Sequence, residues 1–240
     1  MWNTASTGAL GRPGAPFLLR ALVFANGEMN PPPALSQQLR PDDLLIAADG
    51  GLRHCQSLGL TPAVAIGDFD SATAPELEAA QQRGAEVLRY PARKDQTDLE
   101  LALLLAVERG ADELLVLGGL GKRCDQSLAN LLLAAHPGLA GVGLTFLEGD
   151  QRVTAVRGRA VIEGAVGDIV SLIPIGGEAR GVTTHGLEYG LQRGTLPLGS
   201  TLGLSNSLTA RRAEVLVEQG VVLCVQLPGG APGAVEGGSQ

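Results

Sequence analysis

Short apolar runs alternate with longer amphipathic segments along the first part of the chain, from Phe17 to about Leu147. Two of the longer segments, Leu99–Arg109 and Ser127–Ala135, place apolar residues at helical spacing. The apolar runs have the length of strands and are Leu18–Ala25, Leu44–Ala48, Ala63–Ile66, Glu86–Tyr90, Glu113–Leu117 and Gly143–Leu147. Strands that alternate with helices predict βαβ units, and therefore a mostly parallel sheet covered by helices.

Two helix starts are marked by a threonine with a glutamate three residues later, Thr73 with Glu76 and Thr97 with Glu100. This spacing lets the two side chains satisfy backbone N–H groups that have no partner in the first turn of a helix. Helices are therefore predicted to begin directly after Thr73 and Thr97.

The helical pattern ends near Gly149, and short β-like runs separated by Gly-rich turns follow it. These runs are Arg152–Val156, Arg159–Ile162, Ile169–Ile173, Glu188–Leu191, Glu214–Glu218 and Val221–Gln226. They predict a small antiparallel sandwich or barrel. The expected organisation is an α/β domain over residues 17–147 and a small all-β domain over 148–228, with flexible Gly/Pro-rich tails at 1–16 and 229–240.

Composition narrows the class of protein. Of the 240 residues, 45% are hydrophobic and 18% charged, which fits a globular chain with a sizeable core. The net charge of −7 and the lack of a basic run argue against a nucleic-acid binder. Cys55, Cys124 and Cys224 are scattered, so neither a disulfide framework nor a zinc site is expected. Without a signal-peptide pattern or a membrane-spanning stretch, a cytoplasmic location is predicted.

Polar clusters follow four of the predicted strands, at residues 49–51, 67–71, 94–98 and 118–125. In an open parallel sheet, ligands bind beyond the carboxyl ends of the strands. The four clusters are therefore expected to converge on one crevice.

The carboxylates of this crevice suggest a metal. Asp68 and Asp70 are two residues apart, so in an extended segment they project to the same side, and Asp95 and Asp98 can share a face at a helix start. Gathering these charges is costly without a cation, and Mg²⁺ is commonly shared between a few carboxylates and substrate phosphates. The competing interpretation is that each aspartate merely caps a turn or a helix.

The glycines at 50–51 and 118–121 allow the backbone to approach a ligand closely, although glycines after strands are also ordinary turn formers. Neither cluster has the dinucleotide-binding or P-loop spacing. Three cations near the clusters suit a phosphate chain, namely Lys94, Lys122 and Arg123.

Four motifs resemble, in the same order, those of the thiamine pyrophosphokinases. They are Asp49-Gly-Gly, Gly67-Asp-Phe-Asp-Ser71, Lys94-Asp-Gln-Thr-Asp98 and Gly118-Gly-x-Gly-x-Arg123-x-Asp125. The later segments Ser171-Leu-Ile-Pro174, Gly186-Leu-Glu-Tyr-Gly-Leu191 and Gly203-Leu-Ser-Asn206 extend the resemblance over about residues 20–226.

The resemblance implies an α/β nucleotide-binding domain joined to a β-sandwich, in a homodimer that binds thiamine between its subunits. It also implies the activity, a Mg²⁺-dependent transfer of diphosphate from ATP to the thiamine hydroxyl, which yields thiamine diphosphate and AMP.

The resemblance further implies roles for individual residues. The ATP site would comprise Asp49, Gly50, Gly51, Asp68, Lys94, Thr97, Gly119, Gly121, Lys122, Arg123 and Asp125. The metal ligands would be Asp68, Asp70 and Asp98. The catalytic residues would be Asp70, Asp95, Asp98 and Arg123. Thiamine would meet Ser205 and Asn206, with Gln96 reaching it from the partner subunit.

The chain departs from many bacterial members at two positions, with Gln126 in place of His and Ser207 in place of Glu. Two other functions therefore stay open. One is a pyrophosphokinase for another alcohol, such as a hydroxymethylpterin. The other is a non-catalytic nucleotide-binding or thiamine-binding protein. The catalytic base, Asp95 or Asp98, also stays open.

Overall fold

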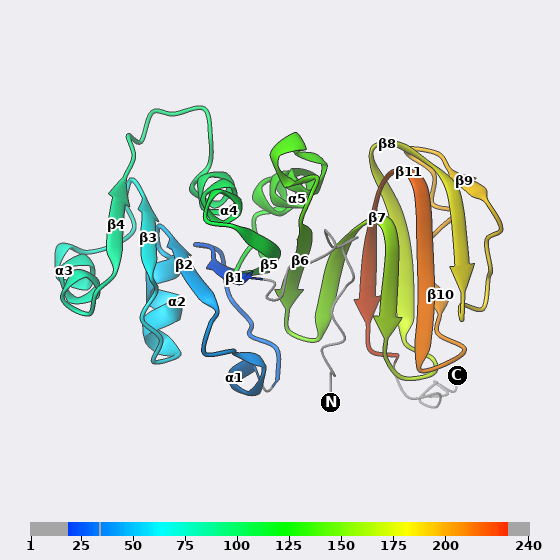
Figure 1. Ribbon diagram of the computed structural model, residues 1–240, viewed down its shortest axis with the longest axis horizontal. Helices are drawn as coiled ribbons and strands as arrows, with labels where there is room; N and C mark the ends of the chain where they lie inside the picture. Colours follow the sequence, from blue (N-terminus) through cyan, green and yellow to red (C-terminus); the bar gives the residue numbers. More distant parts are fainter. Residues whose placement is uncertain (1–18, 34, 230–240) are drawn as a thin grey trace, which may run out of the picture.

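The computed structural model describes residues 19–33 and 35–229 (Figure 1). The predicted tails lie outside the described residues except for Gly229, and so does Leu18 at the start of the first predicted strand. Gly229 donates its backbone N–H to Asp168 Oδ1 over 3.0 Å, so the described chain is tied to the antiparallel half of the fold up to this residue.

Within the described residues, the strands form one 11-stranded sheet. They are β1 (Leu19–Phe24), β2 (Leu44–Ala48), β3 (Val64–Gly67), β4 (Glu86–Arg89), β5 (Ala111–Leu117), β6 (Gly143–Glu148), β7 (Gln151–Glu163), β8 (Ile169–His185), β9 (Gly194–Leu196), β10 (Asn206–Ser207) and β11 (Arg212–Leu227). The strand order is β10-β8-β11-β7-β6-β5-β1-β2-β3-β4, and β9 also pairs with β8.

The helices lie between the strands of the first half. They are α1 (Leu35–Gln38), α2 (Gly51–Ser57), α3 (Ala74–Gln82), α4 (Asp98–Glu108) and α5 (Cys124–Leu132), followed by the 3₁₀ turns η1 (Leu133–Ala135) and η2 (Pro137–Leu139). Both predicted helix starts are present. Thr73 and Glu76 form the full capping box before α3, whereas Thr97 accepts the N–H of Glu100 before α4.

Strands β1 to β6 pair in parallel, and their side chains alternate between two hydrophobic clusters. Ala21 and Val23 of β1 face the cluster that contains Leu103 of α4. Leu22 and Phe24 face the opposite cluster, which contains Leu52 of α2. Because both faces are covered by helices, the strands are apolar almost throughout.

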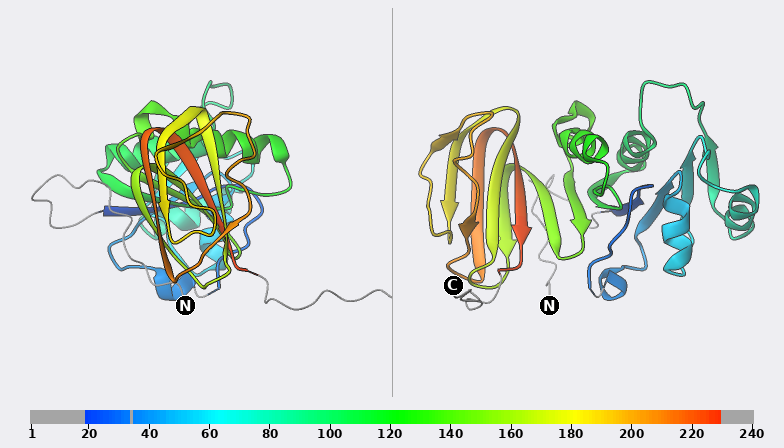
Figure 2. Two further views of the ribbon diagram at one scale, coloured as in Figure 1. Left: turned by 90° about the vertical axis from the view of Figure 1, so that its right-hand side faces the viewer. Right: turned by 180° about the vertical axis from the view of Figure 1, so that it is seen from behind.

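The second half is antiparallel and built mainly from the long strands β7, β8 and β11, which lie side by side (Figure 2, right). Glycines with positive φ interrupt these strands, among them Gly176 (69°) and Gly220 (94°), and the β11 pairings shift register near Gly220. Such positions bend a strand, and side chains of this half enclose a hydrophobic cluster of their own.

The predicted fold class is confirmed: a mostly parallel sheet with helices is followed by an antiparallel, strand-rich region. The two halves share a hydrogen-bonded path, because β6 pairs in parallel with β5 and antiparallel with β7. The proposed domain limit between residues 147 and 148 falls at the end of β6 and remains a prediction.

Some strand predictions need correction. The run Glu188–Leu191 is not a strand but a bend. The side chain of Asn206 hydrogen-bonds both the N–H and the carbonyl of Tyr189. These backbone groups therefore need no hydrogen bonds from a neighbouring strand. The paired runs at 152–162 and at 214–226 each belong to one long strand, β7 and β11, because strand pairing continues through the turn residues between them.

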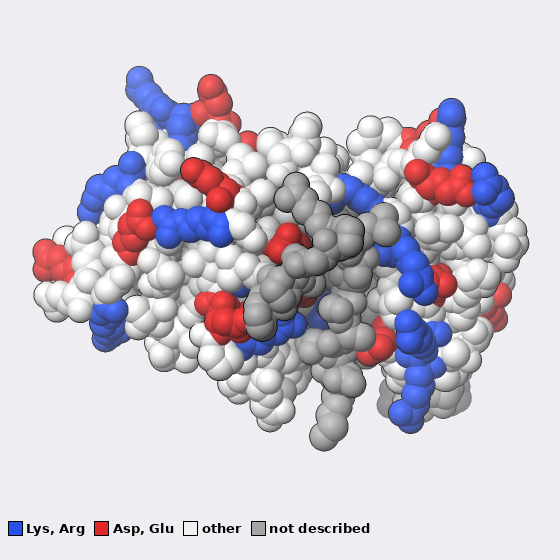
Figure 3. Space-filling view, viewed as in Figure 1, with Lys and Arg blue, Asp and Glu red and all other residues white. Residues whose placement is uncertain are grey.

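Within the described ranges, the structure contains no helix that is both long and apolar enough to cross a membrane. On the face drawn in Figure 3, Lys and Arg side chains lie among Asp and Glu side chains over both halves of the molecule. This mixed surface agrees with the absence of a basic run in the sequence.

Candidate active site

A cavity of about 620 Å³ opens at the carboxyl ends of β1, β2, β3 and β5. Strand β1 lies next to β5 in the sheet, and the chain runs from β1 to β2 in one direction along the sheet and from β5 to β6 in the other. The loops that follow β1 and β5 therefore leave in opposite directions, and a crevice opens between them. Ligands bind in such a crevice in open parallel sheets. The convergence predicted from the sequence is therefore found at this point of the sheet.

The loop after β1 forms one wall of the cavity through Asn26, Gly27 and Glu28. Asn26 Nδ2 donates to Asp49 Oδ2 over 2.8 Å, which links this wall to the end of β2. The backbone N–H of Gly27 donates to Gly118 O over 3.0 Å, and a Cβ at position 27 would lie 2.3 Å from that oxygen. Only glycine therefore allows the loops after β1 and β5 to meet.

His54 supports this junction from helix α2. Its Nε2 lies 2.7 Å from Gly27 O, and its Cδ2 lies 3.5 Å from the position of a Cβ on Gly118. Because the partner is a carbonyl oxygen, Nε2 carries the proton and donates. His54 is partly buried below the cavity loops.

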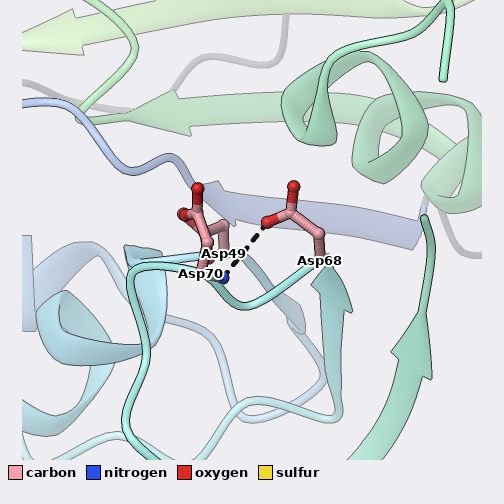
Figure 4. A group of neighbouring side chains, drawn as sticks. All are labelled: Asp49, Asp68 and Asp70. Atoms are coloured by element: carbon pink, nitrogen blue, oxygen red, sulfur yellow. Dashed lines mark hydrogen bonds between the residues drawn. The ribbon is translucent and has the colours of Figure 1, made fainter. Parts of the chain in front are cut away.

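Three aspartates gather at the ends of β2 and β3. Carboxylate oxygens of Asp49, Asp68 and Asp70 all lie within 4.8 Å of one another, and the three groups point to the same side (Figure 4). The proximity of Asp68 and Asp70 was predicted, but not its cause: the backbone between them is not extended, because Phe69 has a φ of 58°.

The cluster suits a hard divalent cation. Asp49 is buried, and its Oδ1 has no hydrogen-bond partner among the described residues, while Oδ2 accepts from Asn26. A buried carboxylate oxygen without a donor is costly unless a cation or another donor meets it. Oxygen ligands from a few carboxylates are those that Mg²⁺ takes in proteins, so these residues fit the predicted metal.

Lys94 provides the positive charge nearest to these carboxylates. Its Nζ lies 2.9 Å from Asp98 Oδ1 and 3.9 Å from Asp68 Oδ2. Burial raises the pKa of the Asp98 carboxyl; the Lys94 ammonium lowers it, and the charges of Asp68 and Asp49 add to the increase. The surroundings of Asp98 thus favour the protonated form of its carboxyl.

Gly67, the last residue of β3, explains how Asp98 comes so close to the cluster. A Cβ at this position would lie 3.2 Å from Asp49 Cβ and 3.2 Å from the Asp98 carboxylate. Its φ of 149° is also one that side-chain-bearing residues seldom adopt. The glycine therefore lets the ends of β2, β3 and α4 pack together.

The Gly-rich loop after β5 forms the opposite wall and is held by helix α5. Asn130 Nδ2 donates to Gly119 O over 2.7 Å, and Ser127 Oγ accepts the N–H of Gly121 over 3.0 Å. Two exposed cations stand on this loop: Lys122 pairs with Glu28 at 2.9 Å, and Arg123 pairs with Asp125. These exposed pairs are weak, so a more highly charged ligand can displace them.

The cavity brings together most of the predicted nucleotide residues. It is lined by Asp49, Asp68, Lys94, Gln96, Thr97, Asp98, Gly119, Gly121, Lys122 and Arg123. Asp70 borders it through the carboxylate cluster. The predicted residues that do not line it are Gly50, Gly51, Asp70, Asp95, Asp125, Ser205 and Asn206.

At positions 50 and 51, glycine is required by close packing against β1 and the loop that follows it. A Cβ at Gly50 would lie 1.8 Å from Asn26 Oδ1, and one at Gly51 would lie 1.9 Å from Phe24 O. Both glycines therefore let α2 start directly against β1.

Ser205 and Asn206 lie far along the sheet from the cavity, next to β8 at the opposite end from β3 and β4. Ser205 is exposed with a φ of 56°, and its N–H donates to Ser171 Oγ. Asn206 is buried and uses its amide to hold the backbone of Tyr189. A single chain thus does not join the predicted thiamine residues to the cavity.

The sequence interpretation missed several residues that line the cavity, among them Asn26, Gly27, Glu28, Ser127 and Asn130. The first three directly follow the predicted strand Leu18–Ala25, so the rule that identified the other clusters applies to them as well. Ser127 and Asn130 are three apart in a helix and share a face, but their hydrogen bonds to the backbone of the glycine loop leave no signal in the sequence.

The fold and the site define a class. The parallel sheet has helices on both faces. Where its connections leave in opposite directions, a carboxylate cluster faces a glycine loop that carries cations. This is the arrangement of an enzyme that binds phosphate-bearing small molecules.

Comparison with known proteins defines the family. The family model "Thiamin pyrophosphokinase, catalytic domain" matches residues 35–141, and "Thiamin pyrophosphokinase, vitamin B1 binding domain" matches residues 160–222. Together the two models cover more than half of the chain. The chain therefore belongs to the thiamine pyrophosphokinase family of enzymes.

Individual relatives agree. The thiamine pyrophosphokinase of Bacillus subtilis is 29% identical over 206 residues, which cover 85% of this chain and 96% of the relative. A crystal structure of thiamine pyrophosphokinase from Bacillus subtilis superposes with a TM-score of 0.77 at 27% identity, covering 87% of this chain and 99% of the other. The enzyme from Candida albicans, at 16% identity, shares the fold with a TM-score of 0.70, covering 88% of this chain and 89% of the other.

Proposed function

We propose that this chain catalyses the transfer of diphosphate from ATP to the hydroxyl of thiamine, with Mg²⁺, giving thiamine diphosphate and AMP. The observation that carries the proposal is the crevice at the carboxyl ends of β1, β2, β3 and β5, where a carboxylate cluster faces a cation-bearing glycine loop. Family membership favours thiamine over a pterin as the acceptor, and an enzyme over a binding protein.

Asp49, Asp68 and Asp70 would hold the metal. Asp49 takes the place of Asp98 in the predicted set, because Asp98 lies outside this cluster and pairs with Lys94. Bound Mg²⁺ would neutralise charge on the phosphate oxygens. Lys122 and Arg123, on the opposite wall, would exchange their exposed carboxylate partners for phosphate oxygens. The loop amides at Gly119 and Gly121 would approach the same phosphate chain.

In the proposed reaction the thiamine hydroxyl oxygen attacks the β-phosphorus of ATP, and the bond from that phosphorus to the bridging oxygen of AMP breaks. The hydroxyl proton needs an acceptor. Asp98 is the better candidate of the two predicted bases, because it lines the cavity and burial raises its pKa, whereas Asp95 is exposed and outside the lining. Lys94, paired with Asp98, would hold this carboxylate in place.

We also propose that the active enzyme is a homodimer with thiamine between subunits. Ser205 and Asn206 lie next to β8, on the far side of the sheet order from the crevice, so one chain does not supply both halves of the site. A second copy can bring its Ser205 region to the first copy's cavity, where Gln96 lines the wall. The scattered cysteines still favour a reducing cytoplasm as the location.

The acceptor is tested by incubating the protein with ATP and Mg²⁺ and measuring AMP with thiamine, with a hydroxymethylpterin, or with neither. AMP release that requires thiamine supports the proposal. AMP release only with the pterin would retain the crevice chemistry and reject the acceptor. Tight nucleotide binding without AMP under any of these conditions would favour a binding protein.

Replacing Asn206 by Ala is expected to affect both stability and thiamine. The side chain accepts the N–H of Tyr189 at 3.0 Å and donates to its carbonyl at 2.8 Å. Loss of these two hydrogen bonds costs about 1–3 kcal/mol in the free energy of unfolding. The thiamine KM is expected to rise about tenfold or more, since each tenfold corresponds to about 1.4 kcal/mol of lost binding.

Steady-state kinetics and denaturant unfolding check both effects of the Asn206 substitution. Ser207→Ala is the matched control, because it removes only the bond from Ser207 Oγ to Glu188 at the neighbouring position. An unchanged thiamine KM in Asn206→Ala, at a protein concentration that keeps the fold intact, would remove Asn206 from the thiamine site. The ATP KM should not change in either variant.

A further inference from the structure

Phe69 stands between two carboxylates of the cluster in a backbone conformation that large side chains seldom adopt. Its φ is 58°, in the left-handed region. There the Cβ of an L-residue crowds the following carbonyl oxygen, so the conformation is unfavourable for a bulky residue. Such a conformation persists only where the surrounding structure holds it.

Two interactions hold Phe69. Its side chain is only 6% exposed and belongs to the same hydrophobic cluster as Leu52 of α2 and Leu77 of α3. The guanidinium of Arg89, at the end of β4, lies 5.3 Å from the centroid of the ring, within the range of a cation–π contact. The ring is thus fixed from the core on one side and by a cation on the other.

The turn at Phe69 determines where the neighbouring carboxylates lie. An extended chain would carry Asp70 about 6.6 Å along the strand direction from Asp68. In the left-handed turn, the N–H of Asp70 instead donates to Asp68 Oδ1 over 3.2 Å, and both carboxylates come within 4.8 Å of Asp49 (Figure 4).

We propose that Phe69 is a positioning residue for the metal site: its buried ring, held by Arg89, keeps the left-handed turn that brings Asp68 and Asp70 to Asp49. This inference rests on the proposed role of these aspartates as Mg²⁺ ligands. The ring does not touch the metal or the substrate in this account and acts only through the two carboxylates.

The test is the affinity of the full chain for Mn²⁺ alone, measured by electron paramagnetic resonance without nucleotide. Phe69→Ala is expected to weaken Mn²⁺ binding about 10-fold to 100-fold, the usual effect of removing a residue that orients metal ligands. Phe69→Leu, which keeps an apolar anchor, should stay within about threefold of the native chain. Arg89→Gln, at an exposed residue, should weaken binding about twofold to fivefold.

Leu196→Ala is the matched control, because Leu196 is equally buried but lies in β9, in the separate hydrophobic cluster of the antiparallel half. It should lose stability and keep the native Mn²⁺ affinity. An equal loss of affinity in Leu196→Ala, or native affinity in Phe69→Ala, would overturn the proposal. If Phe69→Ala does not fold, native affinity in Arg89→Gln overturns it. A native chain that binds no Mn²⁺ would overturn the metal site itself and this proposal with it.

Discussion

Replacing Asp68 by Asn is expected to lower turnover on the order of 100-fold while leaving the fold intact, because a charge is removed where the metal and the phosphate chain would meet. Asp68 lines the cavity, belongs to the carboxylate cluster and lies 3.9 Å from Lys94 Nζ. Asn keeps the shape of the side chain and can still accept the N–H of Asp70. The check is turnover with saturating ATP, thiamine and Mg²⁺, together with the unfolding midpoint.

Asp150→Asn serves as the control for Asp68→Asn, because Asp150 is exposed in the turn between β6 and β7 and outside the cavity lining. It makes the same chemical change and should leave turnover as it is. Near-native turnover in Asp68→Asn would remove this residue from the metal site.

Replacing Asp43 by Ala is expected to reduce the free energy of unfolding by about 3–5 kcal/mol, the usual cost of leaving a buried charge without its partner. Arg20 and Asp43 side chains are both 2% exposed. Arg20 Nε and Nη2 donate to the two carboxylate oxygens at 2.7 Å each, and Nη2 also donates to Gln38 O. This pair ties the start of β1 to the segment before β2, so its loss also loosens two strands that end in the crevice.

Asp42→Ala is the matched control for Asp43→Ala. Asp42 is the exposed neighbour, so its replacement should change the free energy of unfolding by no more than about 0.5 kcal/mol. Denaturant unfolding of the two variants measures the difference. Equal stability of both would show that the buried pair contributes little to this fold.

The parallel half of the fold could be predicted because its signals are local. Leu44–Ala48 is a strand with the predicted bounds, and the Thr73–Glu76 pair forms the capping box that its spacing indicates. The apolar period and the capping residues act within a few positions of one another, so they can be read without knowing the tertiary fold.

The antiparallel half shows what local signals do not contain. The runs around Gly220 look like separate strands, yet β11 continues through the turn, because it pairs with both β7 and β8 on either side of Gly220. Glu188–Leu191 has the pattern of a strand, but the distant Asn206 side chain bonds the backbone of Tyr189 instead. Both outcomes depend on contacts between residues far apart in the sequence.

The candidate site also contains residues that local signals predict and residues that depend on the tertiary fold. The rule that ligands bind beyond strand ends located Asp49, Asp68 and Asp98. The left-handed turn at Phe69 depends on burial of its ring, and the support from His54 depends on where α2 packs, so neither could be derived from spacing. The distance of Ser205 and Asn206 from the crevice likewise follows from the strand order alone.

The central claim is that this crevice transfers a diphosphate group in one step. The most direct test supplies ATP radiolabelled in its β-phosphate, together with thiamine and Mg²⁺, and identifies every labelled and nucleotide product. The account predicts that the label appears in thiamine diphosphate and that AMP forms in an equal amount. Label that remains in ADP, with thiamine monophosphate as the other product, would contradict it.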